Sequence, residues 1–182
     1  MERVREVAAE PTPSLRWSPA DVCTALRIPL AALFILVPDA AWRLVILAAA
    51  ALSDYADGLL ARRFGASRLG AFLDPVADKV FMVAAFGVVL ASGALTILET
   101  LGVLARDITA AVAFLVTVAL RKPASIPARF VGKAVTVGQL LTLGAFLLGM
   151  DLLRPLAWVT ASIALYAIVD YSLAASAQKR DL

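Results

Sequence analysis

Asp54-Tyr55-Ala56-Asp57 and Asp74-Pro75-Val76-Ala77-Asp78 are two acidic stretches set within apolar segments of the chain. Residues three or four apart share one face of a helix, so each pair of aspartates is predicted to project from one side of its helix. The linker between the pairs is short and contains Gly65 and Gly70. We therefore predict two antiparallel neighbouring helices whose acidic faces converge.

The surrounding composition places these helices in a bilayer. Of the 182 residues, 62% are hydrophobic, and the mean hydropathy is +0.87; an average soluble domain is about half apolar. The apolar runs are continuous rather than alternating, which favours helices over a barrel. Six runs lie near the ~20 residues that a spanning helix needs: about Asp21–Val37, Ala41 to the Asp54–Arg63 region, Leu73–Gly93, Leu95–Leu120, Val131–Met150 and Leu153 to about Ala175.

These runs predict an all-α integral membrane protein. Its six transmembrane helices form one domain over residues 21–182, after a cytoplasmic juxtamembrane segment over residues 1–20. That segment lacks the apolar core of a signal peptide, and a disordered tail is an equal alternative for it.

Basic residues set the predicted orientation. With six spans, one side of the membrane holds only Arg43 and Arg154. The other side holds both termini and twelve basic residues: Arg3, Arg5, Arg16, Arg62, Arg63, Arg68, Arg121, Lys122, Arg129, Lys133, Lys179 and Arg180. Lys and Arg favour the cytoplasmic side. We expect a multi-pass protein of the cell inner (cytoplasmic) membrane, with the aspartates at its cytoplasmic face.

The residue inventory restricts the chemistry. The chain has no histidine and a single cysteine, Cys23, which excludes an intramolecular disulfide, a Cys-based metal site and a histidine base. Four clustered carboxylates stay ionised only if cations compensate them, and oxygen ligands favour Mg²⁺, Mn²⁺ or Ca²⁺. Two such ions suit phosphoryl transfer on a diphosphate. The mild net charge of +3 does not imply nucleic acid.

A plainer interpretation of the aspartates is solvation, or pairing with Arg62, Arg63, Arg68 and Lys79. Four carboxylates at these spacings within apolar helices favour function, because ionisable residues in spans are functional candidates.

The pattern Asp54-x-x-Asp57-Gly58-x-x-Ala61-Arg62, followed by Gly70-x-x-x-Asp74-x-x-x-Asp78, resembles the signature of the CDP-alcohol phosphatidyltransferases. Seven residues separate Arg62 from Gly70, fewer than the resemblance predicts, which we interpret as a shortened loop. Thr24-x-x-Arg27 resembles the family's N-terminal element, with Asp21 where asparagine is expected.

The resemblance implies a site and a reaction. Asp54, Asp57, Asp74 and Asp78 would hold two divalent cations, Mg²⁺ or Mn²⁺, against the diphosphate of CDP-diacylglycerol. Asp78 would also be the general base that deprotonates an alcohol acceptor, with release of CMP. The CDP site would be lined by Gly58, Ala61, Arg62 and Gly70. The resemblance also implies a homodimer.

Further basic residues bear on the acceptor. Arg106 lies within the fourth apolar run, and we favour its reaching into the cavity over an ion pair with Asp107. Arg129 and Lys133, at the start of the fifth run, are predicted to form a pocket for an acceptor phosphate; membrane anchoring is the rival interpretation.

The stretch Gly70–Lys79 and the pattern Gly132-Lys133-x-x-Thr136-x-x-Gln139 most resemble the phosphatidylglycerophosphate synthase branch. The acceptor would then be glycerol 3-phosphate. The second pattern also resembles cardiolipin synthases, which would use phosphatidylglycerol, and an inositol phosphate is a further alternative. Two other classes of protein could also use such aspartates: an intramembrane prenyltransferase and a small cation transporter.

Overall fold

Six α-helices form the described part of the chain. The computed structural model describes residues 19–64, 68–119 and 130–178, without side chains at 19–21, 61–64, 68–75, 114, 117–119, 130–131 and 171–178. No strand occurs within these ranges, so the all-α prediction is confirmed for them. The helices are α1 (Pro19–Leu36), α2 (Ala40–Phe64), α3 (Arg68–Ala91), α4 (Ile97–Ala119), α5 (Phe130–Leu147) and α6 (Leu153–Gln178).

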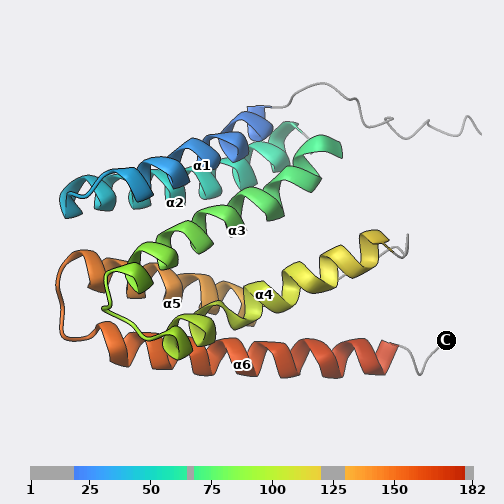
Figure 1. Ribbon diagram of the computed structural model, residues 1–182. Coiled ribbons are helices and arrows are strands. Elements are labelled where there is room, and N and C mark those ends of the chain that lie inside the picture. Colours follow the sequence, from blue (N-terminus) through green and yellow to red (C-terminus); the bar gives the residue numbers. More distant parts are fainter. Residues whose placement is uncertain (1–18, 65–67, 120–129, 179–182) are drawn as a thin grey trace, which may run out of the picture.

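The helices form two groups of three. Helix α1 packs closely on α2 and α3, while α6 packs closely on α4 and α5; contacts between the two groups are much sparser. Figure 1 shows the connections α1–α2, α3–α4 and α5–α6 at one end of the bundle. The opposite end, here called the site end, is defined by Pro19, Phe64, Arg68, Ala119, Phe130 and Gln178.

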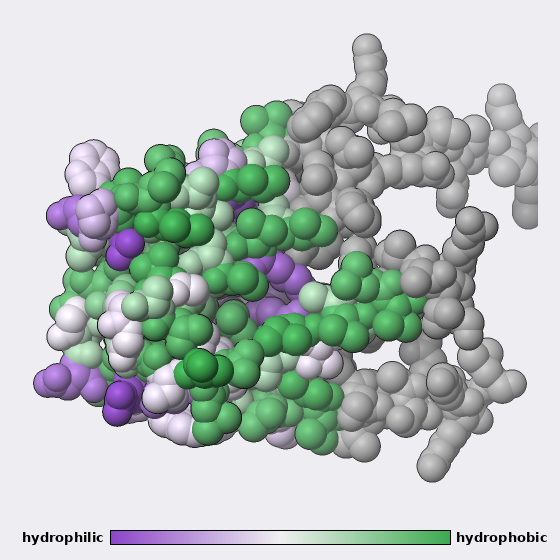
Figure 2. All heavy atoms as spheres, viewed as in Figure 1, coloured by the Kyte–Doolittle hydropathy of each residue, from purple (hydrophilic) through white to green (hydrophobic). Residues whose placement is uncertain are grey.

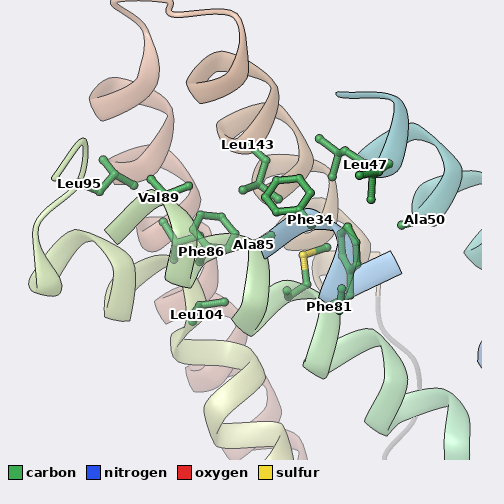
Figure 3. Packing of buried hydrophobic residues seen from close by; sticks show 14 of the residues in the cluster. Phe34, Leu47, Ala50, Phe81, Ala85, Phe86, Val89, Leu95, Leu104 and Leu143 are labelled. Atoms are coloured by element: carbon green, nitrogen blue, oxygen red, sulfur yellow. The ribbon is translucent and has the colours of Figure 1, made fainter. Parts of the chain in front are cut away.

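A continuous apolar core joins the two groups. Phe34 on α1 meets Phe81 on α3 edge to face, with ring centroids 5.8 Å apart, a favourable arrangement for aromatic pairs. Phe86 of α3 is fully buried together with Leu143 of α5, and Figure 3 shows both within one cluster. This core holds the acidic helices α2 and α3 in place against α5.

At the end of the bundle opposite the site end, capping side chains and a glycine explain where helices begin and end. Asp39 accepts a hydrogen bond from the Trp42 amide at 2.9 Å and thereby caps the start of α2. Thr96 and Glu99 form a reciprocal capping box at the start of α4, in which the Thr96 amide donates to the Glu99 carboxylate at 2.8 Å. Helix α3 is followed by Gly93, whose φ of +73° suits the turn that ends it.

One expected boundary is wrong. The third helix was expected to start near Leu73, but α3 begins at Arg68, so Gly70 lies in a helix rather than in the linker. The helix-forming residues Arg68 and Leu69 precede Gly70, and a single glycine weakens a helix only by about 1 kcal/mol. The N-terminal segment 1–18 lies outside the described residues.

The surface is strongly apolar. Large hydrophobic side chains are exposed on α1, α2, α4 and α6, among them Leu33, Leu52, Val112 and Val159. Figure 2 shows apolar residues over most of the described face, with hydrophilic residues at the end opposite the site end and in a second group near the middle of this face. Among the described helices, only α6 contains a segment, Leu153–Asp170, that is both long and apolar enough to cross a membrane. Shorter apolar stretches occupy parts of α1 and α5.

Candidate active site

A hollow between the two helix groups is lined by one aspartate from each acidic helix, Asp54 of α2 and Asp78 of α3. Its empty volume, open solvent included, is about 300 Å³. Four helices line it: α1 through Arg27, α2 through Ala50, Ala51 and Asp54, α3 through Asp78, Phe81 and Met82, and α5 through Thr136 and Leu140. The structure brings Asp54 and Asp78 to one hollow. The prediction that their helices are packing neighbours is wrong, because the described parts of α2 and α3 barely contact each other and α1 packs on both.

The first acidic pair is divided between the hollow and the protein interior. The Asp54 side chain is 55% exposed, whereas Asp57 is only 6% exposed. Both carboxylates bind the same guanidinium nitrogen, Nη2 of Arg27: it lies 3.1 Å from Oδ1 of Asp54 and also donates to Oδ2 of Asp57. The two aspartates share a helix face as predicted, but their surroundings differ.

Polar contacts attach α1 to α2 at this point. The Thr24 hydroxyl donates to Oδ2 of Asp57 at 3.2 Å, one helical turn before Arg27. The Ser53 hydroxyl donates to the Cys23 carbonyl at 2.6 Å. Thr24 and Arg27 lie on the face of α1 that continues into the buried core at Phe34. Helix α1 therefore positions the acidic face of α2 through buried hydrogen bonds as well as apolar packing.

Asp78 stands across the hollow on α3, partly buried. The charges of Asp54, Asp107 and Arg27 all act on its carboxyl group. An oxygen base beside a second carboxylate and a guanidinium is a constellation suited to proton transfer and to binding a cation.

The donor set suits a hard cation, since Asp54 and Asp78 offer carboxylate oxygens to the hollow and Asp54 and Asp57 already converge on a guanidinium. Within the described part of the chain, no three acidic, histidine or cysteine side chains lie close enough together to form a metal site. The Asp74 side chain lies outside the described residues. Convergence of all four aspartates therefore stays a prediction.

Arg106 occupies a different position from the one favoured above. Its Nη1 pairs with Oδ1 of the adjacent Asp107 at 3.3 Å, and Arg106 does not line the hollow. Adjacent helical residues point apart, but the long arginine side chain folds back to the Asp107 carboxylate. That carboxylate is held by Gln139 of α5, whose Nε2 donates to Oδ2 at 2.6 Å.

The structure describes the surroundings of only some of the remaining predicted site residues. Gly58 lies on α2, where an added Cβ would meet no described atom within 4 Å, which leaves room for a ligand. Lys133 is exposed on α5, one turn before Thr136 of the hollow. For Ala61, Arg62 and Gly70 the structure describes only their place in a helix. Arg129 lies outside the described residues.

Sequence reasoning missed the part played by Arg27 and Thr136. Both belong to patterns quoted above, yet neither was expected to face the aspartates. An arginine within an apolar helix is itself a signal, because such a charge needs a partner. The Thr24-x-x-Arg27 spacing then indicates a two-donor face on α1.

Comparison with known proteins agrees with the geometry. The sequence profile of the family described as CDP-alcohol phosphatidyltransferase matches residues 17–169. A CDP-diacylglycerol–glycerol-3-phosphate 3-phosphatidyltransferase of Escherichia coli is 37% identical over 158 residues, which cover 80% of this chain and 82% of the relative.

Two mycobacterial relatives match at 34% identity. One is a putative cardiolipin synthase of Mycobacterium bovis, which matches 71% of this chain, and the other is a probable phosphatidylglycerophosphate synthase of Mycobacterium tuberculosis, which matches 72%. The chain spans 64% and 66% of their respective lengths. The profile match covers most of the chain, including all four aspartates and the α5 face of the hollow, and the chain belongs to the CDP-alcohol phosphatidyltransferase family.

Proposed function

We propose that this protein transfers the phosphatidyl group of CDP-diacylglycerol to glycerol 3-phosphate and releases CMP. The observation that carries the proposal is the hollow in which Asp54 of α2 faces Asp78 of α3, within a chain of this family. The E. coli relative supports glycerol 3-phosphate, because its match extends over 82% of that enzyme and 80% of this chain.

Each aspartate has a proposed role. Asp54, Asp57, Asp74 and Asp78 would hold two divalent cations, Mg²⁺ or Mn²⁺. When bound, these ions would neutralise the negative charge that develops on the leaving diphosphate. The partly buried Asp78 accepts the proton of the acceptor hydroxyl. The acceptor oxygen then bonds to the lipid-side phosphorus, and the bond from that phosphorus to the CMP oxygen breaks.

Open space beside Gly58 supports a nucleotide site on the same helix as the metal ligands. We propose that Gly58, Ala61, Arg62 and Gly70 line it. Arg129 and Lys133 would bind the phosphate of the acceptor. Lys133 follows Gly132 near the start of α5 and precedes Thr136 of the hollow by one turn, which supports placing the acceptor between α5 and Asp78.

We propose that all six helices lie in the bilayer. The exposed apolar side chains of α1, α2, α4 and α6 support this, since water-soluble monomers rarely expose large apolar patches. The basic residues near the site end support an active site that faces the cytoplasm. A homodimer in the inner membrane completes the proposal.

Cardiolipin synthesis is the second candidate, in which phosphatidylglycerol replaces glycerol 3-phosphate as acceptor. The similarity to the M. bovis putative cardiolipin synthase favours it, although the match covers less of both proteins than the E. coli match does. An inositol phosphate as acceptor has no relative of that name among those described above. Family membership likewise leaves the prenyltransferase and the cation transporter without support.

An acceptor screen tests the proposal. Purified protein with CDP-diacylglycerol and Mg²⁺ is offered glycerol 3-phosphate, phosphatidylglycerol, serine, inositol and inositol phosphate, and CMP release is measured. The proposal expects release with glycerol 3-phosphate and its loss on addition of a chelator. Release with phosphatidylglycerol alone would establish the second candidate instead.

A further inference from the structure

Arg27 is a buried cation that the proposed reaction does not use. It is 1% exposed, and it lines the hollow from α1. Burying a guanidinium is costly unless carboxylates and hydrogen bonds compensate it. Here one of its nitrogens, Nη2, binds Asp54 and Asp57 together, so the arginine acts on both members of the first acidic pair.

The two ion pairs are unequal. Asp57 is buried, and its Oδ2 accepts from both Arg27 and Thr24 of α1. Asp54 is 55% exposed, and its Oδ1 lies 3.1 Å from Nη2 of Arg27. The pair with Asp57 is enclosed by protein, whereas the carboxylate of Asp54 is open to whatever enters the hollow.

We propose that Arg27 is a positioning residue that serves as the internal cation of the acidic site. It compensates the negative charge of Asp57 in the protein interior, and it holds Asp54 at the hollow, where that carboxylate would bind a divalent cation. This inference rests on the divalent cation of the proposed function, but not on the identity of the acceptor.

The charges support this role. Arg27 offsets one of the two negative charges of Asp54 and Asp57, and the remaining charge, with that of Asp78 on the same hollow, would attract divalent cations. Without Arg27, Asp54 and Asp57 would lie one helical turn apart with no positive partner among these groups. Two like charges on one helix face repel each other and destabilise the folded state. Arg27 therefore stabilises the metal-free state and competes with the metal for Asp54.

The test measures thermal unfolding and Mn²⁺ affinity in detergent, without turnover. In chelator, Arg27→Gln should unfold at least about 5 °C below the wild type, because a buried carboxylate loses its partner. Mn²⁺ should raise its unfolding temperature more than that of the wild type. Mn²⁺ binding, followed by electron paramagnetic resonance, should tighten about ten-fold, since a neighbouring positive charge is gone.

Arg27→Lys should behave like the wild type more than Arg27→Gln does, because it retains the charge. Arg43→Gln is the matched control. Arg43 lies on α2 near the opposite end and donates to the Phe34 carbonyl at 3.0 Å, so its loss should lower the unfolding temperature equally with and without Mn²⁺. If Arg27→Gln shows this same metal-independent loss and an unchanged Mn²⁺ affinity, Arg27 is a packing residue and the inference is overturned.

A double variant covers the case in which Arg27→Gln does not fold. Arg27→Gln with Asp57→Asn removes both buried charges and should restore a folded protein in chelator. A double variant as unstable as the single one would overturn charge compensation. If the wild type binds no Mn²⁺, the proposed cation site fails, while the comparison of these variants in chelator still decides the role of Arg27.

Discussion

The amide nitrogen Nε2 of Gln139 on α5 lies 2.6 Å from Oδ2 of Asp107 on α4. The same nitrogen also donates to the Val103 carbonyl at 3.1 Å, and both Gln139 and Asp107 are buried. Asp107 in turn holds Arg106. This network joins α4 to α5 one helical turn from Thr136, so it fixes the α5 wall of the hollow.

Replacing Gln139 by leucine should therefore destabilise the protein by about 1–3 kcal/mol, because Asp107 loses its neutral donor while staying buried. We expect a lower unfolding temperature in detergent. Gln139→Glu should cost more, since a second carboxylate would face Asp107. If Gln139→Leu instead left the unfolding temperature unchanged, the network would contribute nothing to the packing of α5.

Asp78→Asn tests the proposed base. Asparagine keeps the shape of the side chain but cannot accept the acceptor's proton, so CMP release should fall by a factor of about 10² or more. Binding of CDP-diacylglycerol, measured by calorimetry, should be largely retained. Turnover at the wild-type rate would remove Asp78 from this role.

Asp151→Asn is the control for this substitution. Asp151 is exposed in the α5–α6 connection, at the end of the bundle away from the hollow. The same chemical change there should alter neither CMP release nor lipid binding. A comparable loss in both variants would indicate a general effect of charge on the detergent-solubilised protein.

Substitutions at two glycines distinguish a position beside a ligand from a position in a helix–helix contact. An added Cβ at Gly58 meets no described atom within 4 Å, whereas at Gly138 it would lie 2.6 Å from Oγ1 of Thr160 on α6. Gly58→Ala should raise the KM for CDP-diacylglycerol. Its unfolding temperature should be unchanged or slightly higher, because alanine favours helices. Gly138→Ala should lower stability by about 1–3 kcal/mol through overpacking between α5 and α6.

Kinetics and thermal unfolding of the two variants check this separation. Thr160 is buried and its hydroxyl lies 3.3 Å from that of Thr142, so it has little freedom to move away from a methyl group at residue 138. A Gly58→Ala variant with unchanged kinetics would contradict a ligand beside Gly58. A fully stable Gly138→Ala variant would contradict the close approach of α5 to α6.

The helices were the predictable part of the fold. Long apolar runs bounded by proline, glycine and charged residues specify them locally, and the starts of all helices but α3 were expected within about two residues. Helix α3 was expected too late because Gly70 resembles a linker residue, although one glycine is tolerated within a helix. Spacing and a short linker predicted that Asp54 and Asp78 would lie at one site, but not that α1 would pack on both α2 and α3 while those two helices barely contact each other.

The spacing of the aspartates could not predict that Arg27 would bind them. Arg27 is separated from Asp57 by 30 residues, and its approach depends on how α1 packs against α2. The same is true of Gln139 and Asp107, which lie 32 residues apart. Since apolar helices can pack through several faces, sequence periodicity alone does not say which buried polar side chains will meet.

Lys133 provides the test that separates an acceptor pocket from membrane anchoring. It is exposed on α5, one turn before Thr136 of the hollow. If it binds the acceptor phosphate, Lys133→Ala should raise the KM for glycerol 3-phosphate about ten-fold or more, since charge-assisted hydrogen bonds to phosphate are among the stronger ones. The KM for CDP-diacylglycerol should change much less.

Lys133→Arg distinguishes the two roles further, because arginine retains the positive charge and also binds phosphate. It should recover most of the acceptor affinity that alanine loses. An anchoring lysine would instead act on the whole enzyme through its position in the membrane. Lys133→Ala would then alter both KM values equally, or neither, and the acceptor pocket would have to be sought at other basic residues near the site end.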